Sequence, residues 1–226
     1  MGTELLPMVF TSGWASGINA YAVVLVLGLA GRFFAIDQVP AVLTRPDVMI
    51  AAGVLFLLEM FADKIPYVDS VWDSVHTAVR PAVGATLGYL LAGHGSSGLE
   101  QAFAAATGGF TALASHGVKA GLRAGVNSSP EPVSNVAVST AEDVAVVGVM
   151  TLATDHPWAA AIIAGVLLLA GIVAIGFLLR RVVGAKRRYD RWGTGLIAEA
   201  RAGIGLGGRR REEPSVHPVR RDDREV

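Results

Sequence analysis

Long apolar blocks alternate with short polar stretches along most of this chain. Three blocks contain no Asp, Glu, Lys or Arg, and they cover residues 13–31, 101–118 and 157–179. A helix needs about 20 apolar residues to cross the hydrocarbon core of a bilayer. The last block is long enough by itself, and flanking residues extend the other two. The pattern therefore predicts an all-α, polytopic transmembrane helix bundle.

Three shorter apolar blocks complete the predicted membrane part, at residues 48–58, 82–93 and 144–154. Each is too short for a full crossing. The alternatives are spans with polar ends, helices broken near the bilayer midplane, and re-entrant segments. Irregular backbone at that depth needs cover from protein or from a water-filled cavity. Before the third block, Ser139 and Glu142 form a capping-box pattern that predicts a helix start.

Two stretches one hundred positions apart indicate a duplication. Residues 10–20 and 110–120 both begin with Phe-Thr and, five residues later, continue with Gly, an aliphatic residue, a polar residue and Ala. An internal repeat with an odd number of spans must be inverted, and transporters often have this architecture. We expect repeats over about 8–98 and 99–183, with about six spans near residues 13–34, 48–65, 80–93, 99–126, 141–154 and 157–183.

The repeat also makes a prediction about packing. Gly17 and Gly117 occupy equivalent positions in the two repeated stretches. Small residues let helix backbones approach closely where lipid supplies no hydrophobic drive between helices. We therefore expect both glycines to lie at close helix contacts near the interface between the repeats.

Residues 69–80 are amphipathic. One face carries Asp69, Asp73, His76 and Arg80, and the other carries valines and Trp72. Tryptophan is frequent at the membrane–water interface. One interpretation is a short interfacial helix that leads into the span after Pro81. The other is the wall of a gate or vestibule.

Charge separates the C-terminal residues from the rest. The formal net charge is zero, but residues 184–226 hold eleven Lys/Arg and seven Asp/Glu. Basic residues after a span favour the cytoplasmic side, so 184–226 is expected to be a basic, largely disordered cytoplasmic tail that touches anionic lipid rather than nucleic acid. With six spans, the N-terminus is cytoplasmic too. The chain has no cysteine, which excludes disulfides and thiolate metal sites.

Charged residues inside the predicted spans are the candidate functional residues. Glu59 and Asp63 lie one turn apart, and His116, Lys119 and Arg123 form a basic stripe at spacings of three and four. A charge within a span costs roughly 2.5–3.5 kcal/mol, so such residues face the protein interior and pair. The pairs either hold the bundle together or line a polar path. The full candidate set is Asn19, Glu59, Asp63, Lys64, Asp69, Asp73, His76, Arg80, His116, Lys119, Arg123, Asn127, Glu131, Asn135, Glu142 and Asp143.

Three strings carry a resemblance to a known family. They are GWASGINAY at 13–21, LEMFADKIPYVDSVWDSVHTAVRP at 58–81, and SHGVKAGLRAGVNSSPEPVSN at 115–135, which is followed by AED at 141–143. The chain resembles, over about residues 8–183, a bacterial family of small multispanning membrane proteins called domain of unknown function 4126. The resemblance implies a membrane location and singles out the candidate set above together with Gly17, Pro66 and Pro130. It implies no activity.

Two functions remain open from the sequence. The first is a transporter or channel for an ion or small polar solute in the bacterial plasma membrane. The second is a non-transporting scaffold or accessory subunit, in which the charges are structural pairs. An enzyme is not expected, because the chain has no catalytic triad order, zinc signature or phosphate-binding loop. No cofactor or metal is expected, and association between copies of the chain stays open.

Overall fold

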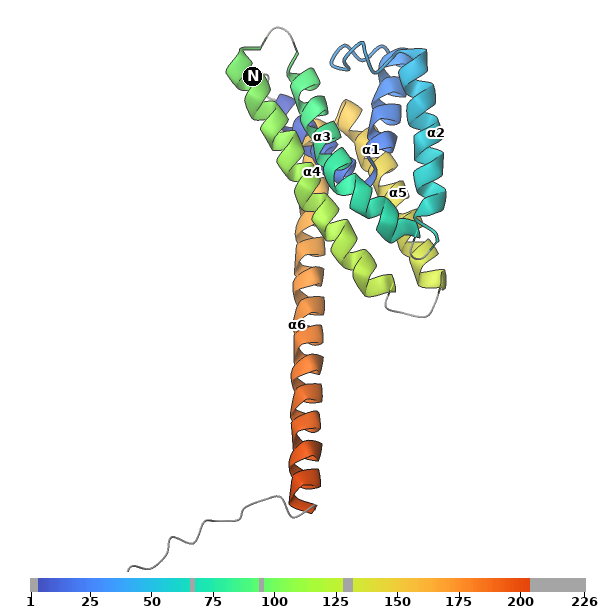
Figure 1. Ribbon diagram of the computed structural model, residues 1–226. Coiled ribbons are helices and arrows are strands. Elements are labelled where there is room, and N and C mark those ends of the chain that lie inside the picture. Colours follow the sequence, from blue (N-terminus) through green and yellow to red (C-terminus); the bar gives the residue numbers. More distant parts are fainter. Residues whose placement is uncertain (1–3, 66–67, 94–95, 128–131, 204–226) are drawn as a thin grey trace, which may run out of the picture. The chain divides into compact units, whose positions relative to one another are not determined.

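The computed structural model describes residues 4–65, 68–93, 96–127 and 132–203, and all regular structure in these residues is helical. Six helices follow one another along the chain (Figure 1). Their bounds are Leu5–Phe33 (α1), Pro46–Ala62 (α2), Val68–Ala92 (α3), Gly98–Asn127 (α4), Pro132–Asp155 (α5) and Pro157–Gly203 (α6). The predicted all-helical class is confirmed.

Local sequence signals explain several helix ends. Proline, whose missing N–H costs nothing at the start of a helix, is the first residue of α2, α5 and α6. At the start of α4, the Ser97 backbone N–H donates to Glu100 Oε2 at 2.9 Å and the Glu100 N–H donates to Ser97 Oγ at 3.3 Å, a reciprocal capping box. Helix α3 ends at Gly93, whose φ of 72° suits glycine.

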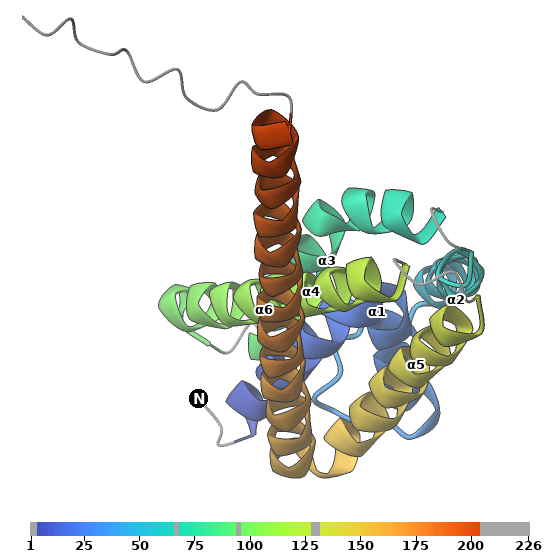
Figure 2. The ribbon, with the colours of Figure 1, turned by 90° about the horizontal axis from the view of Figure 1, so that it is seen from below.

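The chain divides into two compact units, Met1–Leu178 and Leu179–Val226. The first, which we call the bundle unit, contains α1 to α5 and the first part of α6. Within it, α1 contacts α2, α3, α4 and α5, so that α1 is the central helix (Figures 1 and 2). The first part of α6 packs on α4, where Gly171 meets Val118 and Gly121 meets Ile175.

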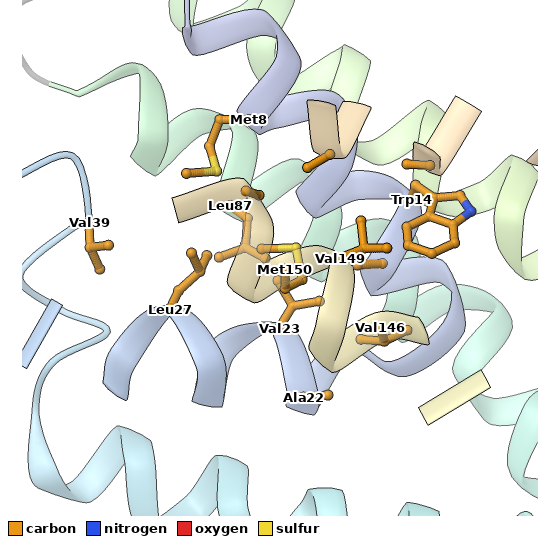
Figure 3. Packing of buried hydrophobic residues seen from close by; sticks show 14 of the residues in the cluster. Met8, Trp14, Ala22, Val23, Leu27, Val39, Leu87, Val146, Val149 and Met150 are labelled. Carbon is orange, nitrogen blue, oxygen red and sulfur yellow. The ribbon is translucent and has the colours of Figure 1, made fainter. Parts of the chain in front are cut away.

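An apolar core lies mainly between α1 and α5. Val23 and Leu27 of α1 gather with Leu87 of α3 and with Val146 and Met150 of α5, and all five side chains are buried (Figure 3). These α1 residues recur at a spacing of four, which places them on one face of the helix. The core therefore joins α1 to α3 and α5.

In the part of the chain that the structure describes, three helices are long and apolar enough to cross a membrane by length and composition, at Leu5–Phe33, Val133–Asp155 and Pro157–Arg181. The apolar window of the first is mostly buried inside the protein, whereas only a minority of the residues in the other two windows is buried. Helix α2 has 17 residues, a length of about 26 Å at 1.5 Å per residue, and neither α3 nor α4 is among these three helices. The chain is thus membrane-like, with fewer evident spans than the six expected.

Two boundary predictions are wrong. Residues 69–80 do not form a separate helix, because α3 continues through Pro81 to Ala92. Ser139 and Glu142 do not begin a helix, since α5 already begins at Pro132. Of the predicted basic tail, residues 184–203 belong to α6, and the rest lies outside the described residues. The sequence of 184–203 contains good helix formers, and these extend a helix that the apolar segment has already nucleated.

The packing prediction is confirmed for one glycine and wrong for the other. A Cβ on Gly17 would collide with Ser115 Oγ and with the Ala112 carbonyl oxygen, so α1 and α4 touch there. A Cβ on Gly117 would meet nothing within 4 Å. The repeat in sequence does not decide which face of each helix has a neighbour, and Gly117 lies on an exposed face of α4.

Candidate functional site

Helix α1 is broken at Asn19, in its middle. Asn19 has φ −148° and ψ 97°, an extended conformation that interrupts the helix, and its side chain is fully buried. Its Oδ1 accepts a hydrogen bond of 2.9 Å from the Ala22 backbone N–H. Asparagine is among the best residues for capping the N-terminus of a helix. Asn19 therefore ends one half-helix and caps the next inside the protein.

Side chains of α4 bind two carbonyl groups of α1 near the break. Lys119 Nζ donates to the carbonyl of Ile18, directly before Asn19, at 2.9 Å, and Ser115 Oγ donates to the Trp14 carbonyl, one turn earlier, at 2.6 Å. Unsatisfied backbone groups are costly away from water. The carbonyl group next to the break is therefore satisfied by a side chain that lies 101 positions away in sequence.

The same Lys119 joins the break to the acidic pair of α2. Its Nζ lies 2.6 Å from Asp63 Oδ2 and 3.8 Å from Glu59 Oε1. Glu59 and Asp63 are both buried. They lie one turn apart, so they share the helix face that points into the protein. The acidic and basic stripes thus pair as the sequence analysis expected.

Arg123, one turn after Lys119, links four segments of the bundle. It donates to the Asp63 carbonyl at 2.7 Å and to Asn135 Oδ1 at 3.0 Å. It also lies 2.8 Å from Glu142 Oε2 and 3.7 Å from Asp69 Oδ2. Because the guanidinium presents five N–H groups in a fixed plane, one arginine can join this many acceptors.

Arg80 of α3 fixes the protonation of His116. Its guanidinium lies 2.5 Å from Glu59 Oε1 and 2.9 Å from Asp73 Oδ1, and it donates to His116 Nδ1 at 2.6 Å. Arginine has no acceptor, so Nδ1 carries no proton and the imidazole is neutral. His116 Nε2–H then donates to Thr77 Oγ1 at 3.0 Å, since the Thr77 hydroxyl proton goes to the Asp73 carbonyl.

Two further candidates lie at the edges of this network. His76 bonds Tyr21 rather than a charged residue, with 3.0 Å between its Nε2 and the phenol oxygen, and stacks on Trp72. Asp143 accepts a hydrogen bond of 3.3 Å from Asn19 Nδ2 and lies 3.8 Å from Lys64 Nζ. Asp143 therefore brings a carboxylate to the start of the second half of α1, where the helix dipole favours negative charge.

The described network contains more acids than bases. Six carboxylates face four Lys or Arg side chains, and the acidic members are Glu59, Asp63, Asp69, Asp73, Glu142 and Asp143. His116 is neutral, and even a protonated His76 would leave the balance negative. Buried Glu59 Oε2 and Asp63 Oδ1 have no hydrogen-bond partner among the described residues. Most buried polar atoms in proteins are satisfied, so these two oxygens are exceptions, and only the other oxygen of each carboxylate binds a basic side chain.

A cavity of about 430 Å³ opens beside the network, between α1, α4, α5 and α6. Its walls are almost entirely apolar and include Trp14, Ile18 and Leu168. Lys119 and Glu142 supply its charged groups. Glu142 is the most exposed acid of the network, with 15% of its side chain accessible. The cavity lining does not include Glu59 or His116.

Sequence reasoning found most of the residues that the structure brings together. Two candidates cannot be placed, because Glu131 and the side chain of Asn127 lie outside the described residues. No pattern in the sequence indicates the cavity or the contacts of Tyr21 and Ser115. Among the residues that the structure describes, no group of three His, Asp or Glu side chains could hold a metal ion.

Comparison with known proteins places this network within one family. Residues 6–176 match the family described as Domain of unknown function (DUF4126). The chain belongs to the DUF4126 family. No curated protein and no solved structure matches the chain. The DUF4126 match contains the break in α1, the charged network and the cavity, so all three belong to the family domain rather than to the C-terminal residues.

Proposed function

We propose that the protein is a transporter or channel for an ion or small polar solute. The observation that carries the proposal is the break at Asn19 in α1, a helix apolar and long enough to cross a membrane. Broken helices in transporters present helix ends and free carbonyl groups to ions and substrates near the bilayer midplane. In this protein the break adjoins a network with a surplus of carboxylates.

The proposed function also implies an arrangement of the chain in the membrane. We propose six spans in an inverted three-plus-three repeat, with both termini in the cytoplasm and the basic residues of 184–226 against anionic lipid of the plasma membrane. Support comes from the packing of the two repeated stretches on each other, where Gly13 meets Thr111 and Gly17 meets Ser115. Reporter fusions at residues 1 and 226 test it. Opposite locations of the two ends would contradict the inverted repeat.

The scaffold remains a second candidate, because each basic side chain of the network has a carboxylate at 3.8 Å or less. Pairing of every base suits a structural role, although buried pairs often add little net stability. In either function the protein binds or conducts without chemical conversion.

Flux measurements separate the two candidates. We would reconstitute the full chain in liposomes and measure H⁺, Na⁺, K⁺ and Cl⁻ flux for the native protein, Glu142→Gln and Asp47→Asn. Glu142 lies on the cavity, whereas Asp47 pairs with Arg45 at an exposed site. The proposal expects flux in the native protein and in Asp47→Asn, and its loss in a folded Glu142→Gln. Absence of any flux in the native protein would favour the scaffold.

A further inference from the structure

The cavity beside the network has the size and polarity of a small-molecule site. Ligand pockets typically occupy about 300–1,000 Å³ and combine apolar walls with a few placed polar groups. This cavity has a volume of about 430 Å³, and its charged groups are Lys119 and Glu142. An inorganic ion would leave most of such a cavity unfilled, so its walls favour a ligand with a large apolar body.

The two charged groups differ in how far they are already engaged. Lys119 is buried, and its Nζ binds Asp63 and the Ile18 carbonyl. Glu142 is more exposed, and its Oε2 binds Arg123 at 2.8 Å. The charge that a ligand in the cavity can reach is therefore the Glu142 carboxylate, because 15% of its side chain is accessible against 2% of that of Lys119, from which it lies 3.8 Å away. Trp14 adds an aromatic ring to the wall, and aromatic faces attract cations.

We infer that this cavity binds a hydrophobic organic cation, with its positive charge near Glu142 and its apolar body among α1, α4, α5 and α6. Such a ligand neutralises part of the surplus negative charge and fills the apolar volume at the same time. An anion of equal shape would meet the same walls but would add to the surplus. As a substrate assignment this rests on the proposed transport function, whereas binding can be measured without flux.

Two probes of nearly equal shape and opposite charge test the inference. Equilibrium dialysis of the full chain in uncharged detergent micelles would measure binding of tetraphenylphosphonium and of tetraphenylborate, with protein-free micelles as the blank. We expect saturable binding of the phosphonium and none of the borate above the blank. Equal binding of both ions, or no binding of either, would overturn the inference.

Variants locate the binding site. Glu142→Gln should weaken phosphonium binding roughly tenfold or more, a change of about 1.4 kcal/mol. Ala141→Phe keeps the charge but puts a large side chain at an exposed position on the cavity wall, and it should weaken binding as well. Asp47→Asn, far from the cavity lining, should bind as the native protein does. Unchanged binding in both cavity variants would place the site elsewhere and overturn the inference.

Binding and flux together distinguish the two proposals. Charge-selective phosphonium binding without flux of any tested ion would uphold the site and contradict transport. Flux of an inorganic ion without phosphonium binding would uphold transport and overturn the inference. Phosphonium uptake into liposomes that is lost in Glu142→Gln would support both.

Discussion

The helix pair α3 and α4 is packed in two different ways along its length. At one end, Gly84 and Gly88 of α3 face Gly108 and Ala104 of α4, and the backbones nearly touch. A Cβ on Gly84 would lie 2.7 Å from the Gly108 carbonyl oxygen. Contacts of this kind have one geometry only, because neither helix has a side chain that could move aside.

At the other end, the same two helices are joined by long charged side chains. Arg80 of α3 meets His116 of α4, and one turn further along α4 Lys119 reaches α2. Lys119 Nζ lies 2.6 Å from Asp63, and both Glu59 and Glu142 are also near, at 3.8 Å. A small movement would exchange its partners.

The difference shows how one helix pair can hold its shape and still contain a polar centre. The glycine end fixes the approach of α3 and α4, whereas the charged end places three carboxylates within 3.8 Å of Lys119. A site that must bind and release a solute needs the second kind of packing, and a stable bundle needs the first. The following predictions test this division, starting with the largest expected effect.

Removing Arg80 should be the most damaging change at the charged end. Arg80→Met leaves Glu59 and Asp73 without their strong partner, and breaking a buried pair from one side typically costs about 3–5 kcal/mol. We expect a large fall in the free energy of unfolding in micelles. The double variant Arg80→Met/Glu59→Gln should recover part of it, since Glu59 then carries no charge. Native-like stability of the single variant would contradict the role of this pair.

At the glycine end, Gly84→Ala should cost about 1–3 kcal/mol, the usual range for overpacking. The added Cβ would lie 2.7 Å from Ala112 Cβ and from the Gly108 carbonyl oxygen. Gly117→Ala on α4 is the matched control, because a Cβ there meets nothing within 4 Å. We expect the control to be neutral or stabilising, since alanine favours helix. Equal unfolding midpoints for both variants would refute the close contact.

Asn19→Ala tests the break that faces the charged end. It removes the cap on the Ala22 N–H and the hydrogen bond to Asp143. Loss of an N-terminal cap costs about 0.5–2 kcal/mol. Thermal unfolding in micelles should show this decrease, while Asn19→Asp should retain most of the stability because aspartate also caps. An alanine variant as stable as the native protein would mean that the cap contributes nothing to the break.

The smallest effect is expected outside both ends, at the exposed pair of Arg45 and Asp47. The hydrogen bond from Arg45 lowers the pKa of Asp47, so the pair contributes only above the unfolded pKa of the carboxyl and is lost as the pH falls through the folded pKa. Solvent screens such a pair strongly. Asp47→Asn should therefore leave the unfolding midpoint at pH 7 unchanged. A clear decrease would show that burial is not what distinguishes the charged end.

The sequence by itself determined the helical class and the faces on which charges lie. Helical periodicity is local, so spacings of three and four put Glu59 with Asp63, and Lys119 with Arg123, whatever surrounds them. The same reasoning failed at Ser139 and Glu142, because a capping pattern inside a helix has no free N–H groups to cap. There the tertiary structure used Glu142 to bind Arg123.

Only the tertiary structure decided where α1 breaks and which glycine is packed. The break depends on Lys119 and Ser115, which bind carbonyl groups 101 positions earlier in the chain. No local pattern records such a contact, because its energy arises only when α4 lies against α1. The cavity has the same origin, since its walls come from four helices that share no sequence signal. Local periodicity determines which side chains share a helix face, and long-range packing determines which of those side chains find a partner.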